Sequence, residues 1–131
     1  MRVKIHFEIL FDVFIFLKKV MDESEIKRQT QEVISHNFDL PELTDSDFDR
    51  LRKILIDRVD DLLNHDFEKL LWILYRVDVS ESRANQLLAE HPDKPAEVLA
   101  DLVIERQIQK VRSRLNYKKS TTDNRDSELL M

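Results

Sequence analysis

The sequence contains no glycine among its 131 residues, and this absence restricts what the chain can fold into. At the usual frequency of about 7%, a chain of this length holds roughly nine glycines. Tight two-residue hairpins depend on residues with positive φ, a conformation that glycine adopts most readily. The composition therefore disfavours antiparallel sheet and favours helices joined by other turn residues.

The missing glycine also excludes several functional motifs. Phosphate-binding loops, dinucleotide-binding turns and the nucleophile elbow of serine hydrolases all need glycine where the backbone turns sharply or approaches a ligand. The chain also has no cysteine, so disulfides, thiolate metal sites and cysteine nucleophiles are excluded, which suits a reducing cytoplasm. We expect a cytoplasmic protein that has no cofactor and no enzymatic activity.

Length and polarity place the chain among small globular proteins. Hydrophobic residues make up 42% and charged residues 36% of the sequence, with a net charge of −5. A chain of this length can bury one continuous core without metal or disulfide support. We expect a single all-α domain over residues 21–116, folded as a compact bundle of about five helices.

Residues 1–20 differ from the rest of the chain, because 13 of them are apolar. Every odd position from Val3 to Leu17 is apolar, an alternation that is typical of a half-buried strand. The charges of Glu8 and Asp12 disfavour both a secretory signal and a membrane span. In an alternative interpretation, Met21 is the natural start and residues 1–20 are translated upstream sequence.

Five helices are expected from hydrophobic spacing and from end signals. Ser80 is a suitable N-cap, Pro95 fits the first turn of a helix, and Asn37 is suited to a left-handed position after a helix. Residues 117–131 are polar and are expected to form a flexible tail. The expected helices span residues 22–36, 48–63, 67–77, 81–90 and 95–115.

The third expected helix contains the apolar run LLWILY at residues 70–75. A helix that is apolar on nearly every side is typical of a buried, central position. We therefore expect this helix in the middle of the bundle, with the second and fifth helices packed over it. Trp72, Tyr75 and Arg76 are also the residue types that dominate protein interfaces, so the sequence offers two interpretations of Trp72, core and interface.

Charge is unevenly distributed along the chain. Residues 22–104 carry 20 acidic and 10 basic residues, whereas residues 105–119 carry six basic residues and one acidic residue. A basic helix end can contact nucleic-acid phosphates, or it can simply complement the dipole of its own helix. The candidate phosphate-contacting residues are Arg106, Lys110, Arg112, Arg114, Lys118 and Lys119.

No arrangement of histidines and carboxylates in the sequence predicts a metal or a catalytic site. Glu32 and His36 lie one turn apart but do not form the paired Glu-x-x-His motifs of a di-iron centre. The acidic positions of residues 57–61 are expected to be a solvated helix face. A less favoured, enzymatic alternative would bring together Asp57, Asp60, His65 and His91.

Three runs carry a family resemblance: LLNHDF at residues 62–67, LYRVDV at residues 74–79 and ADLVIERQ at residues 100–107. Together they resemble a small family of uncharacterised, all-helical bacterial proteins of the Bacteroidetes type. The resemblance covers about residues 45–115. It implies no activity, ligand or catalytic residue.

These observations predict a small interaction or accessory protein that does not act on a membrane. Its expected partner is another protein or a second copy of the same chain. The alternative is a nucleic-acid- or ribosome-associated protein that uses the basic end of its last helix. The interface candidates are Trp72, Tyr75 and Arg76.

Overall fold

The computed structural model describes the backbone of residues 2–41, 43 and 47–129, and the side chains of residues 12–41, 43 and 47–118. Within these residues the chain forms five α-helices and no strand, which confirms the predicted helical bundle. The helices are α1 (Arg2–Phe38), α2 (Phe48–His65), α3 (Phe67–Arg76), α4 (Glu81–Glu90) and α5 (Pro95–Leu129).

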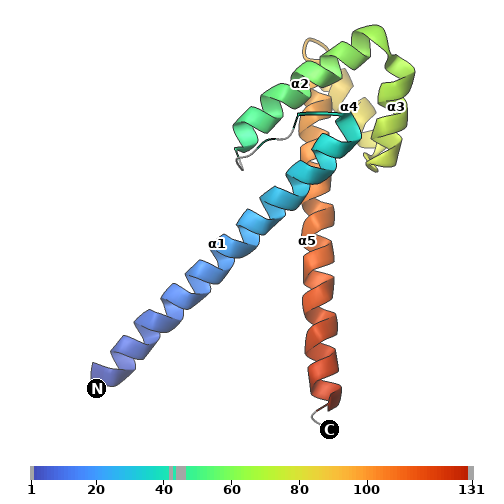
Figure 1. Cartoon of the computed structure of the whole chain (residues 1–131). Helices are drawn as coiled ribbons and strands as arrows, with labels where there is room; N and C mark the ends of the chain where they lie inside the picture. The colour runs from blue at the N-terminus through green and yellow to red at the C-terminus, as the bar shows by residue number, and fades with distance from the viewer. Residues whose placement is uncertain (1, 42, 44–46, 130–131) are drawn as a thin grey trace.

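The molecule has a head and two helical arms (Figure 1). The head, residues 23–114, combines α2, α3 and α4 with the last turns of α1 and the first half of α5. The α1 arm, residues 2–22, and the α5 arm, residues 115–129, extend from the same side of the head and diverge from each other. The buried side chains of α1 and α5 accordingly lie in the head.

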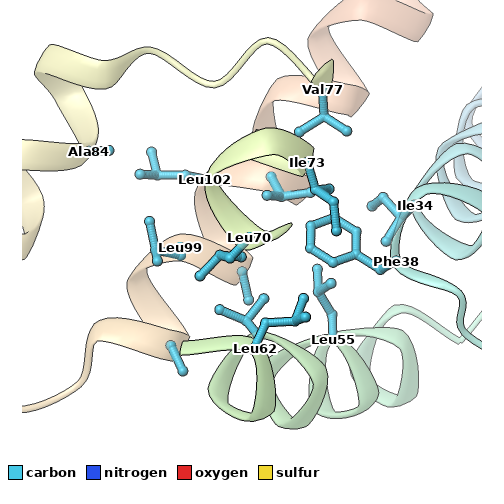
Figure 2. Close-up of a cluster of buried hydrophobic side chains, with 14 of the residues drawn as sticks. Ile34, Phe38, Leu55, Leu62, Leu70, Ile73, Val77, Ala84, Leu99 and Leu102 are labelled. Carbon is cyan, nitrogen blue, oxygen red and sulfur yellow. The ribbon is translucent and has the colours of Figure 1, made fainter. Parts of the chain in front are cut away.

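The core of the head draws on all five helices (Figure 2). Helix α2 contributes Leu51, Leu55, Val59 and Leu62, whose spacing of three and four residues places them on one side of the helix. Phe38, at the end of α1, points into the cluster between Leu55 and residues of α3 (Figure 2). The other buried members are Ile34, Leu70, Ile73, Val77, Ala84, Ala96, Leu99, Ala100, Leu102 and Val103.

Helix α5, and not α3, is the central helix of the head. It packs against α1, α2 and α4, whereas α3 packs mainly against α2. The prediction that residues 67–77 form the middle of the bundle is therefore wrong. Of the ten residues of α3, only Leu70 and Ile73 are buried, because the bundle covers one side of this helix and leaves its other apolar side open.

The strand predicted from alternation in residues 1–20 is also wrong, since α1 is helical from Arg2. The even positions 10, 14, 16 and 20 are apolar as well, so the alternation is not strict. The apolar positions 3, 7, 10, 14, 17 and 21 follow the spacing of a helix. No proline or glycine separates this segment from residue 22, so the helix continues without a break.

Helix α5 is longer than the sequence indicated. The sequence predicts an end near Leu115, but the helix continues to Leu129 through the segment predicted as a polar tail. This segment contains neither proline nor glycine, and its polar residues do not interrupt the backbone hydrogen bonds of a helix. The structure therefore extends the helix by 14 residues beyond the predicted end.

Two aspartates occupy the left-handed positions that glycine usually fills. Asp39 has φ 54° after α1 and Asp78 has φ 64° after α3. In each turn the following amide reaches back five residues, from Leu40 to Ser35 at 2.9 Å and from Val79 to the carbonyl of residue 74 at 3.1 Å, as in a Schellman motif. Asn37, predicted for this role, instead lies in α1, where its side chain donates to the carbonyl of residue 33.

The predicted helix starts agree with the structure better than the predicted helix ends do. Ser80 caps α4 as predicted, and its Oγ accepts a hydrogen bond from the backbone N–H of Arg83. Asp47 caps α2 and Asp66 caps α3, each by accepting a backbone N–H two or three residues later. Residues 44–46, which precede Asp47, lie outside the described residues.

Candidate functional site

The outer side of α3 exposes an aromatic and apolar surface. Trp72 is 61% exposed and Tyr75 is 85% exposed, and both lie beside Leu71, which is half exposed. Phe67 extends this surface by one turn toward the start of the helix. We call these four residues the α3 patch.

The local sequence explains why α3 presents this surface. Leu70, Ile73 and Val77 are spaced by three and four residues and are buried in the core. The patch residues 67, 71 and 75 are spaced by four and therefore form a second stripe, rotated by about a third of a turn from the buried one. The helix is fixed at its start by the Asp66 carboxylate, which accepts the N–H of Lys69.

Arg76 belongs to the same surface. Its guanidinium lies 5.4 Å from the centre of the Trp72 ring, within the range of a cation–π interaction. This contact joins the two side chains on one exposed surface of α3. The three interface candidates named from the sequence therefore lie together, and Trp72 is a surface residue and not a core residue.

Sequence reasoning missed Phe67 and Leu71 as members of the patch. The signal that could have found them is the spacing of four residues that joins positions 67, 71 and 75. Trp72 and Tyr75 alone leave on the order of 300 Å² in water at these exposures, which gives the patch a size that is often functional on a monomer. Such a surface can bind an apolar side of another protein.

The basic end of α5 is divided between two sides of the helix. Lys110, Arg114 and Tyr117 follow one another at spacings of four and three residues and share one side. Arg112 lies two residues from both basic members and therefore points away from them. Tyr117 is exposed and adds an aromatic ring to this stripe. The predicted candidate Lys119 lies outside the residues whose side chains are described.

Arg106, the first of the predicted basic residues, has a structural partner. Its guanidinium donates to the Asp78 carboxylate at 2.7 Å and to the Asp78 backbone carbonyl at 3.1 Å. The hydrogen bond to the carboxylate and the positive charge of Arg106 lower the pKa of the Asp78 carboxyl. Arg106 thus fixes the turn after α3 against α5.

A half-open pocket of about 280 Å³ lies between this turn, α4 and α5. Its charged side chains pair with one another: Arg83 with Glu105 at 2.9 Å, and Arg106 with Asp78 at 2.7 Å. Ser80, which also lines the pocket, uses its hydroxyl to cap α4. The arrangement contains charge pairs that hold helices together, and Ser80 has no histidine beside it among the pocket-lining residues.

Of the four residues in the enzymatic alternative, Asp57 and Asp60 lie within α2, and the two histidines lie at helix ends. His65 ends α2, where its Nδ1 lies 3.0 Å from the Asp61 carbonyl, and His91 follows the last residue of α4. Among the residues that the structure describes, no three histidine or carboxylate side chains are grouped as a metal site requires. Across the same part of the chain, no helix combines the length and the apolar character of a membrane span.

Comparison with protein-family models, with curated proteins and with solved structures finds no match for this chain.

Proposed function

We propose that this protein is a non-enzymatic interaction module that binds a protein partner through the α3 patch. The observation that carries the proposal is the exposure of Trp72 and Tyr75 on a helix whose other side is anchored in the core. Trp, Tyr and Arg are the residues that most often dominate binding energy at interfaces. All three occur here within one helical turn and a half.

The proposal rests on how the patch is organised as well as on its composition. Leu70 and Ile73 hold α3 against the rest of the head, so the patch loses little backbone freedom when a partner binds. The cation–π contact with Arg76 likewise limits the movement of the Trp72 ring. A surface that is ordered before binding is expected to bind more tightly than a flexible one of equal area.

The non-enzymatic part of the proposal is supported by the pocket between α4 and α5. Its arginines and carboxylates are paired with each other, and its hydroxyl is used as a helix cap. General acid–base or nucleophilic catalysis needs such groups to be directed at a substrate. A cytoplasmic location, suggested by the cysteine-free sequence, belongs to the same proposal.

Site-specific photo-crosslinking tests the interaction. A photoreactive p-benzoylphenylalanine at Tyr75 should form a discrete covalent adduct with a partner in cells, because this side chain is the most exposed of the patch. Adding Trp72→Ala should remove the adduct. The matched control places the same group at Gln86, an exposed position of α4. Identical adducts from positions 75 and 86, or no adduct from position 75, would contradict the proposal.

The stripe of Lys110, Arg114 and Tyr117 favours one second candidate function, the binding of single-stranded nucleic acid. Two cations and an exposed aromatic ring on one side of a helix provide both phosphate contacts and a stacking surface. In this case the affinity for a single-stranded RNA should fall as salt rises from about 50 to 200 mM, whereas an apolar interface should change little. Lys110→Gln with Arg114→Gln should reduce this salt dependence, and Arg112→Gln, on the other side of α5, should not.

A further inference from the structure

The α1 arm exposes a second apolar surface, distant along the chain from the α3 patch. Phe14 is 64% exposed and Met21 is 70% exposed, and Leu17, between them, is half exposed. Their spacing of three and four residues places them on one side of α1. The same spacing continues toward the N-terminus at positions 10, 7 and 3, which are all apolar. We call residues 14, 17 and 21 the α1 seam.

The α1 seam and the residues of α1 that pack in the head lie on different sides of the helix. At 100° per residue, it is rotated by about a third of a turn from Thr30, Ile34 and Phe38, which are buried. Continued toward the head, the seam reaches Ser24 and Arg28, which are exposed. Arg28 is held there by ion pairs at 2.6 Å to Glu25 and to Glu32. The protein's own core therefore cannot extend to cover the seam.

We propose that the α1 seam is covered by the α1 arm of a second copy of this chain. Besides the seam, the arm exposes Val13, Phe16 and Val20 on the adjoining side, which widens the apolar face to what a helix packed on another helix buries. Two phenylalanines and four aliphatic side chains with about half or more of their surface in water expose on the order of 500 Å² per chain. Two such arms together approach the 1,200 Å² or so of a small specific interface.

Charge favours a protein occupant over a lipid surface. The polar side of the arm carries acidic and basic residues together, with Asp12 and Asp22 beside Lys18 and Lys19. Helices that lie on membranes usually have a polar side dominated by lysine and arginine, which is attracted to anionic lipid. A mixed polar side instead suits a helix pair, in which flanking residues of both signs can form ion pairs across the interface.

Sedimentation velocity of the full chain tests the proposal. Over about 1 to 100 µM, the wild-type protein should shift toward twice the mass of one chain. Phe14→Glu combined with Leu17→Glu should raise the dissociation constant at least about 100-fold, because each change buries a charge in the seam. The matched control is Ile15→Glu, which lies on the polar side of the same turn, one helical turn from Lys19, and should leave dimerisation unchanged.

Circular dichroism distinguishes loss of dimerisation from loss of folding. The seam residues are exposed, so the double variant should keep its helical signal and its folded head. Three outcomes would overturn the proposal: a wild-type protein that stays monomeric over this range, a dimer that the double variant leaves intact, and a monomer whose arm binds anionic lipid vesicles instead. None of these outcomes affects the α3 patch, so the proposed function is tested separately.

Discussion

Helices α2 and α3 are separated by a single residue, Asp66, yet they use their apolar residues in different ways. In α2 the large apolar side chains are buried or partly buried in the core, and its charged residues form the solvent side. In α3, Leu70 and Ile73 are buried, whereas Phe67, Leu71, Trp72 and Tyr75 face solvent. The apolar residues of α2 therefore support folding, whereas α3, in which seven of ten residues are apolar, also leaves a free surface.

The difference shows what determines burial in this molecule. Helix α2 packs against α1, α3 and α5, so its one apolar side is fully used. Helix α3 packs mainly against α2 and has apolar residues on two sides, of which the head can cover one. Apolar residues that the fold leaves exposed as a patch often form binding surfaces.

The largest expected effect is a difference in stability between a variant of α2 and a variant of α3. Leu55→Ala removes a fully buried side chain of α2 and should lower the free energy of unfolding by about 2–5 kcal/mol. Trp72→Ala removes a larger side chain from α3, but it should cost only about 1 kcal/mol or less, because only the contact with Arg76 and some area are lost. Urea titration of both variants measures the difference. Equal losses would show that the α3 patch is structural.

A smaller effect is expected where a polar side chain is buried. Gln107 of α5 donates from Nε2 to the Val77 carbonyl at 2.7 Å and thereby fixes the end of α3. Gln107→Leu should lower the free energy of unfolding by about 1–3 kcal/mol, because the buried carbonyl loses its donor. Gln86→Leu, at an exposed position of α4, is the control and should change stability little. The same urea titrations compare these variants.

A change in the opposite direction is expected at Thr30 of α1. This residue is fully buried, and its Oγ1 has no hydrogen-bond partner among the residues that the structure describes. Thr30→Val keeps the shape and removes the unpaired hydroxyl, so it should raise the free energy of unfolding by about 1 kcal/mol. Thermal denaturation provides the measurement. A lower melting temperature would indicate that the hydroxyl is bonded through a water molecule.

The smallest expected effect on stability lies on the exposed side of α1. The Arg28 guanidinium donates to the Glu25 carboxylate at 2.6 and 3.1 Å, and these bonds, with one from Gln29, lower the pKa of Glu25 from 4.5 to about 2. Because the pKa is lower in the folded protein, this contribution is present above pH 4.5 and is lost as the pH falls toward about 2.

The exposed ion pair should therefore be visible in titration and nearly invisible in stability at neutral pH. Arg28→Gln should raise the pKa of Glu25 toward its ordinary value, which carbon-detected NMR titration of the side-chain carboxyl would follow. Arg50→Gln, a change in α2 that leaves the Glu25 hydrogen bonds intact, is the control. An unchanged pKa in the Arg28 variant would contradict the assigned cause.

The parts of the fold that sequence reasoning predicted are those governed by local chemistry. Ser80 and Pro95 mark helix starts because capping and the missing proline N–H act within one turn. The spacing of Leu51, Leu55 and Val59 identifies the buried side of α2, because most of its charged residues fall on the other side. Each of these signals is contained in a few neighbouring residues.

The predictions that failed concern features that the local sequence does not determine. The run at residues 70–75 is apolar on both sides, and only the arrangement of the other helices decides which side is covered. Residues 1–20 combine an alternating with a helical spacing, so the local pattern supports two structures. The three interface candidates could be named from their residue types, but their exposure could not be predicted.

The two aspartate turns have a consequence for how this sequence can vary. Each aspartate joins helices as well as ending one: Asp39 pairs with Lys69 at 3.5 Å and Asp78 pairs with Arg106 at 2.7 Å. A single base change converts an aspartate codon into a glycine codon. Glycine would adopt the positive φ more readily, but the ion pair would be lost. Homologues with glycine at either turn are therefore expected to vary freely at the matching cation, whereas homologues with aspartate should keep it.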